Sequence, residues 1–360
     1  MRKNNGITLI ALIITIIILL ILVGVSINLA IKGDLFASAE KAVDGTNAKV
    51  EQEQTRVDEL MEELNKMNDK EKDEKIIQSI EEGIYLIQEL AGNMNEIHST
   101  LQRLRELSVQ TANSVKAESD RNAIKSEVIH LIKEIDRVSS ETNYKNEKLL
   151  NGTFARSVGV SELLLKIDNL SADELGLDSS NIDTHFATSE AANAYSKKID
   201  QAILKTANNR CKADAIQNAL EYLLEYYQEV KNIIASNTLN MDKKIAKAGL
   251  VEVKNMLDRC VILCGYATEL QEYPEDLKSF QIEMEKLIIA IDHIETNAQY
   301  NGQKLLDGSY SNISKINSTT LGGGMKLPTD VSTTENVQNT KQKDQEAINM
   351  VEKEIEKLGM

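Results

Sequence analysis

The hydrophobic positions of the chain recur mainly with helical periodicity. Apolar side chains follow one another at intervals of three and four residues over 76–112 and again over 119–139. This spacing gathers them on one face of a helix. A third stripe keeps one heptad register over 195–234, and its members include Ile199, Ile216, Leu220, Leu223 and Tyr227. A single helix of that length cannot bury its stripe alone, so we expect it to pack against the two helices before it.

These stripes predict a mainly α-helical protein, built as an elongated helical bundle or coiled coil. Polar Thr206 and Asn209 interrupt the third stripe, and we interpret them as residues that fix the register of packing. The region from Val158 to Asp168 is the only credible strand region of its part of the chain, and we expect a short β-hairpin or extended segment there. Upstream, the thin amphipathic pattern before Ile76 predicts a polar helical stalk that ends in the charged run over 69–75.

A charge-free run near the N-terminus has a different pattern. Arg2 and Lys3 are followed by a stretch from Ile7 to Ile31 that carries no charged residue. At ~1.5 Å of helix per residue, this run is long enough to cross a bilayer. The basic residues before it predict that Met1 lies in the cytoplasm and that the rest of the chain lies outside. We therefore expect a transmembrane-type helix that contacts the membrane through Ile7–Ile31.

The residues around Gly6 add a processing signal to this run. Lys3-x-x-Gly6-Ile7-Thr8-Leu9-Ile10 resembles the N-termini of prepilins, which a peptidase cuts after the glycine. The resemblance implies a candidate processing site between Gly6 and Ile7. Pilins carry a glutamate five residues into the mature chain, where this sequence has Ala11. A plain uncleaved anchor is the alternative.

An internal repeat relates two parts of the chain. A shift of 156 positions, from Leu101 to Leu257, superimposes many identical residues without gaps. The identical pairs include Arg103 and Arg259, Leu107 and Leu263, Glu127 and Glu283, and Asp136 and Asp292. Shared helical bias does not produce such density at a constant offset, so we infer a duplicated unit. We expect its second copy to be partial, over 257–310, and to be followed by a flexible loop and a short terminal helix over 311–360.

The charge distribution argues against nucleic-acid binding. The formal net charge is −15, and it is spread along the chain without a basic block. Nucleic-acid binding requires a basic face, so we expect no such partner.

The candidate chemistry also argues against catalysis and against a cofactor or metal. The four histidines are scattered, without a nucleophile or carboxylate grouping around any of them: His98, His130, His185 and His293. The three cysteines are too few for a disulfide framework. Cys260 and Cys264 share a helix face, and we interpret them as small buried hydrophobic residues. We predict a protein that is not an enzyme.

Longer motifs in the repeated unit resemble a known family. NEIHSTLQRLRELSVQTAN (95–113), DRNAIKSEVIHLIKEIDRVSSETNY (120–144) and KLLNG look like the N-terminal conserved region of bacterial flagellins. SEAANAYSKKIDQAILKTANNRCKADAIQNALEYLL (189–224) is similar to their C-terminal conserved helix. The resemblance covers about 76–257 and, in part, 257–310. It implies a helical rod domain whose halves pack together and make subunit contacts in a bacterial cell-surface filament.

The chain departs from the flagellin pattern at its ends. Flagellins have an additional first helix and a matching last helix that line the filament core, whereas this chain has the prepilin-like run and the stalk. We therefore divide it into a membrane-type segment (1–31), a stalk (32–75), a flagellin-like rod domain (76–256), the partial repeat (257–310) and the terminal region (311–360). The alternatives to a filament subunit are a pilin-like minor subunit and a membrane-anchored surface protein that does not polymerise.

The resemblance also implies partners. It implies self-association with like subunits or with other flagellins. In some flagellins an innate immune receptor recognises the first helix and the helix that follows it. Arg103, Leu107 and Glu127 match that pattern. The alternative is that these three residues serve ordinary subunit packing.

Overall fold

The computed structural model describes residues 69–113, 118–177 and 179–359. The predicted membrane-type run Ile7–Ile31 and the candidate processing residues Gly6 and Ile7 lie outside these residues, as does most of the predicted stalk. Within the described part of the chain, no helix combines the length and the apolar character that a membrane span requires.

The described chain is mainly helical, as the periodicity predicts. Its helices are α3 (Asp69–Asn113), α4 (Glu118–Glu141), α5 (Ile182–His185), α6 (Ser189–Ser236), α7 (Met241–Glu269), α8 (Pro274–Asn297), α9 (Ser318–Leu321) and α10 (Thr334–Lys357). Its strands form three two-stranded antiparallel pairs: β1 (Asn143–Tyr144) with β2 (Glu147–Lys148), β3 (Ala155–Ser157) with β4 (Leu164–Lys166), and β5 (Gln299–Tyr300) with β6 (Gln303–Lys304). The pair β3–β4 is the hairpin expected between Val158 and Asp168, begun three residues earlier.

The longest helix, α6, begins and ends at well-defined caps. The side chain of Thr188 accepts a hydrogen bond from the Ala191 N–H, which satisfies one of the free donors of the first turn. Asn237 ends the helix in the left-handed conformation. Between these caps the sequence contains neither proline nor glycine, so nothing breaks the hydrogen-bond ladder. The stripe therefore continues over the full length that the heptad pattern indicates.

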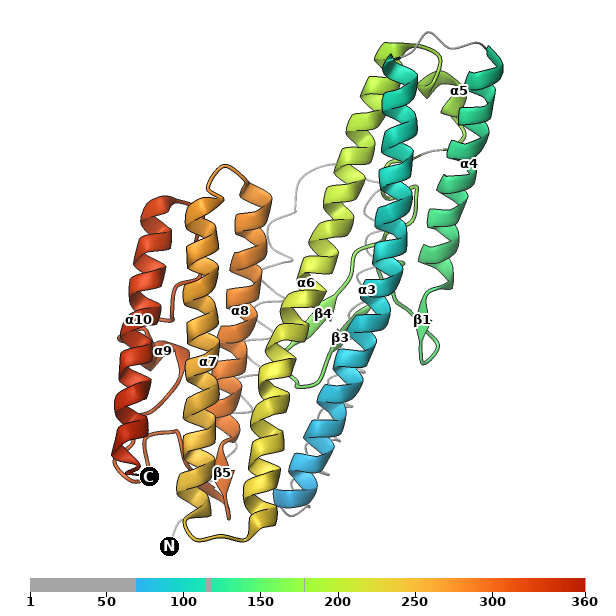
Figure 1. Ribbon diagram of the computed structural model, residues 1–360. Helices are drawn as coiled ribbons and strands as arrows, with labels where there is room; N and C mark the ends of the chain where they lie inside the picture. Colours follow the sequence, from blue (N-terminus) through green and yellow to red (C-terminus); the bar gives the residue numbers. More distant parts are fainter. Residues whose placement is uncertain (1–68, 114–117, 178, 360) are drawn as a thin grey trace, which may run out of the picture. The chain divides into compact units, whose positions relative to one another are not determined.

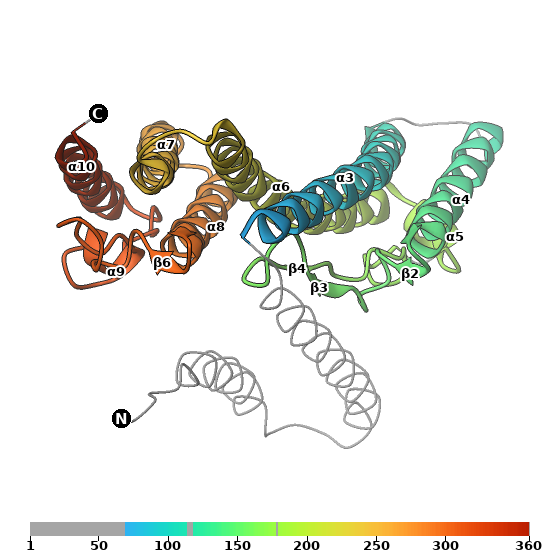
Figure 2. The same ribbon diagram turned by 90° about the horizontal axis from the view of Figure 1, so that it is seen from below.

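The structure contains two modules of similar construction. The helices α3 and α4 lie on one side of α6, and α7, α8 and α10 lie on the other (Figure 1, Figure 2). We call α3, α4, α6 and the hairpins between them the first module, and α7, α8, α9 and α10 the second module. In the first module α6 packs along α3, and in the second module α10 packs along α7. The C-terminal half of α6 also packs against α7 and α8, so that α6 contributes to both modules. Their buried apolar side chains form one continuous core.

The hairpin β3–β4 lies close to α3 and α6 at a point that only glycine fits. Gly159 has φ +71°, and a Cβ atom there would collide with a Leu220 methyl group. The neighbouring Gly83 of α3 approaches the Gly159 nitrogen so closely that its own Cβ would lie 2.9 Å away. The Ser79 hydroxyl donates a hydrogen bond of 2.8 Å to the Gly159 carbonyl. The hairpin thus covers the α3–α6 seam at the minimum distance that the backbone allows.

The structure differs from the expected stalk at one place. The charged run over 69–75, predicted as the end of the polar stalk, forms the first turns of α3. Alternating acidic and basic residues support a helix through i,i+3 and i,i+4 pairs, and no glycine or proline intervenes.

A second difference concerns residues 311–360, for which the sequence predicts a flexible loop and a short helix. The connection to α10 buries five apolar side chains: Ile313, Ile316, Leu321, Leu327 and Val331. The helix itself, α10, buries a stripe against α7. The second module therefore has a partner helix of its own, and the repeat is more complete than the ungapped part of the alignment indicates.

Candidate helix-packing interface

The predicted partner-helix stripe lies in the core. Ile199, Ile216, Leu220, Leu223 and Tyr227 are all buried. Asn209, which we interpret as a register-fixing residue, is buried too, and its side-chain oxygen accepts a hydrogen bond of 2.9 Å from the Asp168 N–H. The amide therefore fastens the end of β4 to a fixed position along α6. This contact is compatible with the predicted register-fixing role of Asn209, which stays a prediction.

Arg103 and Glu127 join α3 to α4 through an ion pair. Arg103 Nε lies 2.7 Å from Glu127 Oε1, and Arg103 Nη1 lies 2.9 Å from Glu106 Oε2. Hydrogen bonds to Glu127 and Glu106 raise the pKa of the guanidinium, which stays charged at every physiological pH. Leu107 lies one turn further along α3 and is buried. Of the three residues predicted to face a subunit or a receptor, two are on the surface and the third is in the core beneath them.

The second module repeats this ion pair. Arg259 Nε lies 2.8 Å from Glu283 Oε1, and the two residues join α7 to α8. Here α6 covers the pair: Asn218 of α6 donates a hydrogen bond of 3.0 Å to Glu283 Oε1. The side chains of Arg259 and Glu283 are 32% and 13% exposed, against 48% and 42% for Arg103 and Glu127. The surface around the Arg–Glu pair is thus exposed to solvent in the first module and covered by α6 in the second.

Further paired contacts show that the modules fold alike. An aspartate near the end of the second helix accepts a hydrogen bond from a backbone N–H in each: Asp136 from Ala172 at 2.8 Å, and Asp292 from Ser318 at 2.7 Å. A threonine caps the partner helix in each, Thr188 before α6 and Thr333 before α10. The carboxylate of Glu354 accepts from the Ser314 N–H at 3.1 Å, in the place where Asn209 accepts in the first module.

A three-residue hydrogen-bond network crosses between the modules. The Tyr227 hydroxyl of α6 lies 3.0 Å from Nε2 of His293 in α8, and His293 Nδ1 lies 3.1 Å from a carboxylate oxygen of Glu162 in the β3–β4 turn. Burial raises the pKa of Glu162, but the hydrogen bond and charge of His293 outweigh it and leave the pKa at about 2. Burial raises the pKa of the Tyr227 phenol as well. The network holds the first module's hairpin and α6 against the second module.

The sequence does not reveal this network. In the sequence His293 is one of four scattered histidines, and Glu162 lies 131 residues away from it. The position that the repeat assigns to His293 in the first module is Arg137, which instead pairs with Glu96, Glu134 and Glu141. The only indication in the sequence is that the repeat has arginine at this position in its first copy and histidine in its second.

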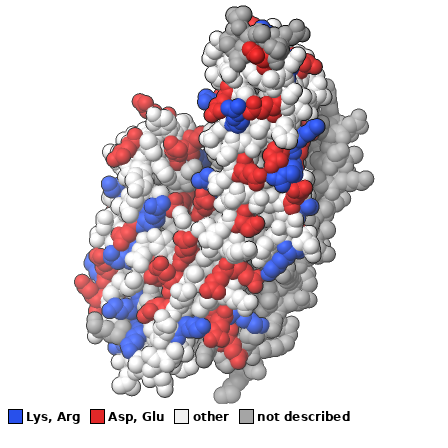
Figure 3. Space-filling view, turned by 45° about the vertical axis from the view of Figure 1, so that its right-hand side comes forward, with Lys and Arg blue, Asp and Glu red and all other residues white. Residues whose placement is uncertain are grey.

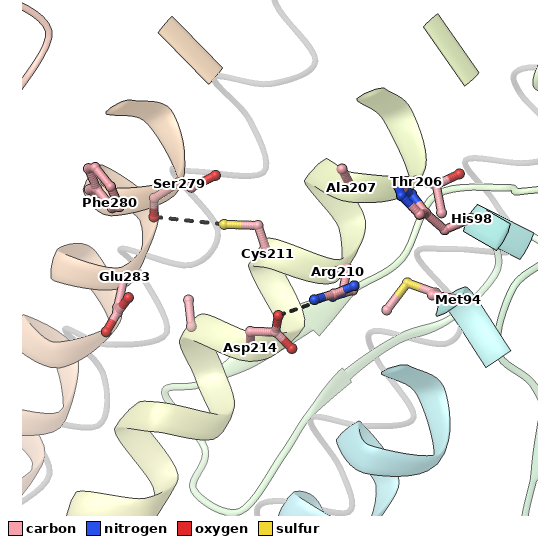
Figure 4. A pocket seen from close by; sticks show the side chains of 11 residues that line it. Met94, His98, Thr206, Ala207, Arg210, Cys211, Asp214, Ser279, Phe280 and Glu283 are labelled. Atoms are coloured by element: carbon pink, nitrogen blue, oxygen red, sulfur yellow. Dashed lines mark hydrogen bonds and ion pairs between the residues drawn. The ribbon is translucent and has the colours of Figure 1, made fainter. Parts of the chain in front are cut away.

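A shallow pocket of about 380 Å³ lies where α3, α6 and α8 meet (Figure 4). The Cys211 thiol points toward the Ser279 carbonyl oxygen at 3.7 Å, and Arg210 lies 3.5 Å from Asp214 (Figure 4). Burial raises the pKa of the Asp214 carboxyl and of the Cys211 thiol. A partly buried thiol with a raised pKa is a poor nucleophile. In the described part of the chain, no group of three histidine, cysteine or acidic side chains is placed to hold a metal ion.

The charged side chains on the face that Figure 3 shows are mixed in sign. Acidic side chains cover more of that face than basic ones, and basic side chains are interspersed among them. Ion pairs such as Arg105–Asp200 join neighbouring helices, and others such as Lys254–Asp258 lie within one helix. This distribution is that of a solvated helical surface.

These features define a class of protein: helical packing modules in which a pair of helices is completed by a long partner helix, with surfaces made for contact with further helices. Residues 65–155 and 235–311 both match the family model of the bacterial flagellin N-terminal helical region. The resemblance to bacterial flagellins that the sequence indicates is therefore confirmed over these two segments. Each segment contains one Arg–Glu pair of the kind described above.

Similar proteins support this assignment. The chain is 32% identical over 176 residues to a flagellin of Halalkalibacterium halodurans, an alignment that covers 46% of this chain and 63% of the relative. It is 28% identical over 279 residues to the phase 2 flagellin of Salmonella typhimurium (68% of this chain, 53% of the relative), and 30% identical over 203 residues to a flagellin of Salmonella paratyphi A (52% and 40%). The chain thus spans roughly half the length of the curated relatives that it matches.

Proposed function

We propose that this protein is a structural, non-catalytic subunit of an extracellular flagellin-type filament. The observation that carries the proposal is the contact between the modules. There, the partner helix α6 of one flagellin-type module packs on the α7–α8 surface of another, over the Arg259–Glu283 pair. A filament requires contacts of this kind between chains. A surface that joins unlike faces, as this one does, generates an open filament when it is repeated between subunits and the rotation does not close into a ring.

The test is electron microscopy of surface material from cells that express the chain. We expect filaments from the natural sequence. The variant Arg103→Glu removes the open ion pair from the first module, and Lys133→Glu makes the same charge change at an exposed position of α4 away from that pair. The proposal requires that Arg103→Glu shortens or abolishes filaments more than Lys133→Glu does. Only monomeric protein from the natural sequence would contradict it.

The family match favours this function over that of a pilin-like minor subunit. The two differ in what they require of the N-terminus. We propose that Ile7–Ile31 enters the membrane and that the chain is displayed outside it, on the strength of the charge-free run and the preceding basic residues. N-terminal sequencing of the mature protein tests the route: a start at Ile7 supports cleavage after Gly6, and a retained Met1 supports an uncleaved anchor.

We also propose boundaries for the domains. The first module begins within 69–76 and ends with α6, and the second extends from Met241 to Leu358, beyond the predicted end at 310. The burial of Leu358 and of the α10 stripe supports the longer second domain. Expression of 241–360 alone tests it, since an independent domain should unfold cooperatively.

Recognition by an innate immune receptor is a second candidate function, through Arg103 and Glu127. Both side chains are about half exposed in the first module, and the matching pair is largely covered in the second. Leu107 is buried, so it supports that surface from below. Receptor activation that is lost in Arg103→Glu but kept in Arg259→Glu would support this partner; equal losses would count against it.

A further inference from the structure

The second module's partner helix carries an acidic residue in the middle of its buried stripe. Asp344 is 1% exposed and lies in α10, where that helix packs on α7. Neither of its carboxylate oxygens has a hydrogen-bond partner. Unpaired burial of a carboxylate is costly, and it is tolerated only when the group keeps its proton or when the element that carries it can move.

The partner helix of the first module, α6, has an apolar residue at the position equivalent to Asp344. Asp344 lies eleven residues after the capping Thr333, and the residue eleven after the capping Thr188 is Ile199. Ile199 is fully buried between α6 and α3. We call the buried contact of a partner helix with its helix pair the seat. The two modules therefore place an apolar and an ionisable side chain at the same position of the seat.

Two further positions of the seat also become more polar in α10, whereas Val351 stands where α6 has the buried Thr206. Seven residues after the cap, the first module has the buried Tyr195 and the second has Thr340, whose hydroxyl donates to the Asp330 carbonyl. At the far end, the neutral amide of Asn209 is replaced by Glu354, a carboxylate that is held by Ser314 and Lys357. The seat of α10 is thus less apolar than that of α6 at the positions of Thr340 and Glu354.

The groups around Asp344 supply no counter-charge inside the seat. The titratable side chains that act on it from α7 are the thiols of Cys260 and Cys264, both buried. Burial raises the pKa of both thiols, with the proximity of Asp344 adding to the effect, so both stay uncharged. On α10 itself, Lys341 lies one turn earlier, with its side chain exposed. Burial alone raises the pKa of Asp344, to about 8.

We propose that α10 is a releasable helix, held on α7 while Asp344 carries its proton and freed from α7 when that carboxyl group is ionised. Release uncovers the apolar face of α7, while the first module, with Ile199 at the corresponding position, keeps α6 docked. The connection over 322–333 begins with three consecutive glycines, and its buried Leu327 and Val331 must leave the core together with α10. This device is independent of the filament proposal.

The direction of the pH dependence follows from linkage. A carboxyl group whose pKa is near 8 when docked and near 3.8 when free favours release progressively as pH rises between these values. The ratio of released to docked α10 increases by up to about tenfold per pH unit in that window and levels off near pH 8. Below pH 4 the carboxyl group has no effect on docking.

Cys264 reports release, because its thiol is buried close to Asp344 of α10, and Cys260, which also interacts with Tyr222 of α6, gives a second readout. The full-length chain, in mild detergent, is labelled with N-ethylmaleimide from pH 5 to pH 9, and each cysteine is quantified by mass spectrometry. Asp344→Asn and Asp344→Ile keep the seat uncharged, and Glu356→Gln changes an exposed acid of the same helix. Dividing each rate by that of Asp344→Asn removes the intrinsic pH dependence of thiol reactivity.

For the natural chain and for Glu356→Gln, we expect the normalised rate at Cys264 to rise about tenfold per pH unit from pH 5 to pH 7. For Asp344→Ile we expect a flat profile. A flat profile in the natural chain would refute the device. A parallel rise at Cys211, which lies on α6 outside the α7–α10 contact, would also refute it, since the opening would then not be confined to α10.

Discussion

The two modules of this protein build two helix pairs on a shared set of residues, but their partner helices differ. The partner helix α6 has a mainly apolar buried stripe, and the partner helix α10 has a buried acidic residue in its stripe. In the first module α6 buries Tyr195, which packs on His185 and Phe186, and Ile199. In the second module α10 presents Thr340 and Asp344 to α7 at the equivalent positions. The Arg–Glu pair is kept in both. Duplication has therefore preserved the framework while the partner helices have diverged, which indicates that they serve different purposes.

The largest expected effect comes from giving the first module the second module's residue. Ile199→Asp buries an unpaired carboxylate between α3 and α6 and should lower the free energy of unfolding by about 3–5 kcal/mol. Urea denaturation followed by circular dichroism measures it, with Ile199→Val as the control that removes only one methylene. A loss no greater than that of the control would show that the two positions are not equivalent.

The reverse exchange should stabilise the second module. Asp344→Ile removes the buried acid and should raise the free energy of unfolding by about 2–4 kcal/mol near pH 8. The folded-state pKa of Asp344 is raised to about 8, above its ordinary 3.8, so its penalty is full above pH 8 and vanishes as pH falls below about 4. Denaturation at pH 4, 6 and 8 measures the difference, which should shrink toward acid. A gain that is constant over this range would mean that the effect is one of packing and not of charge.

The next largest effect is expected from disrupting the Tyr227–His293–Glu162 network between the modules. His293→Ala leaves the buried Tyr227 hydroxyl without its partner and should cost about 1–3 kcal/mol. We expect denaturation to separate into two transitions as the modules uncouple. Ser279→Ala, which removes a side-chain hydrogen bond to the Glu275 carbonyl within the same helix and away from His293, is the control. One unchanged transition in His293→Ala would show that the helical contacts alone couple the modules.

Acid should weaken the same network through Glu162. Its pKa lies at about 2 in the folded chain, below the ordinary value of 4.5. The contribution of this carboxylate is therefore present above pH 4.5 and is lost as pH falls toward 2. Glu162→Gln should abolish that part of the acid dependence, as seen in the pH profile of thermal unfolding. Profiles of identical shape for variant and natural chain would argue against the ion pair with His293.

The smallest effect separates the two Arg–Glu pairs. Arg103→Ala disrupts an exposed pair, and we expect no change outside experimental error. Arg259→Ala leaves the largely buried Glu283 with only Asn218 and should cost about 1–2 kcal/mol. Parallel urea titrations of both variants measure the contrast. Equal losses would mean that α6 does not desolvate the second pair.

Much of the fold follows from local patterns in the sequence. The heptad register over 195–234 predicts α6, and the constant shift from Arg103 to Arg259 is enough to reveal the duplication. The limits of the pattern lie where it is interrupted. After Gly308 the second copy is shorter, so an ungapped comparison ends there and does not show that Thr333 takes the role of Thr188.

The contacts of the helix-packing interface are harder to predict from the sequence than the helices themselves. Arg103, Leu107 and Glu127 belong to one motif, and the sequence does not separate the surface pair from the core residue beneath it. The Glu162–His293–Tyr227 network joins a turn and two helices that are remote along the chain. Such contacts depend on how the modules meet, which periodicity does not encode.

The sequence by itself determined the helical class, the repeat and the family, because helix periodicity and identities at a constant offset are properties of residue order along the chain. The tertiary structure decided which copy of a shared surface is covered, where His293 finds its partners and that Asp344 is buried. These outcomes depend on the packing of α6 and α10 against distant helices. A charged residue in an amphipathic stripe is expected from sequence to be solvated, and only its packed neighbours show that solvent does not reach it.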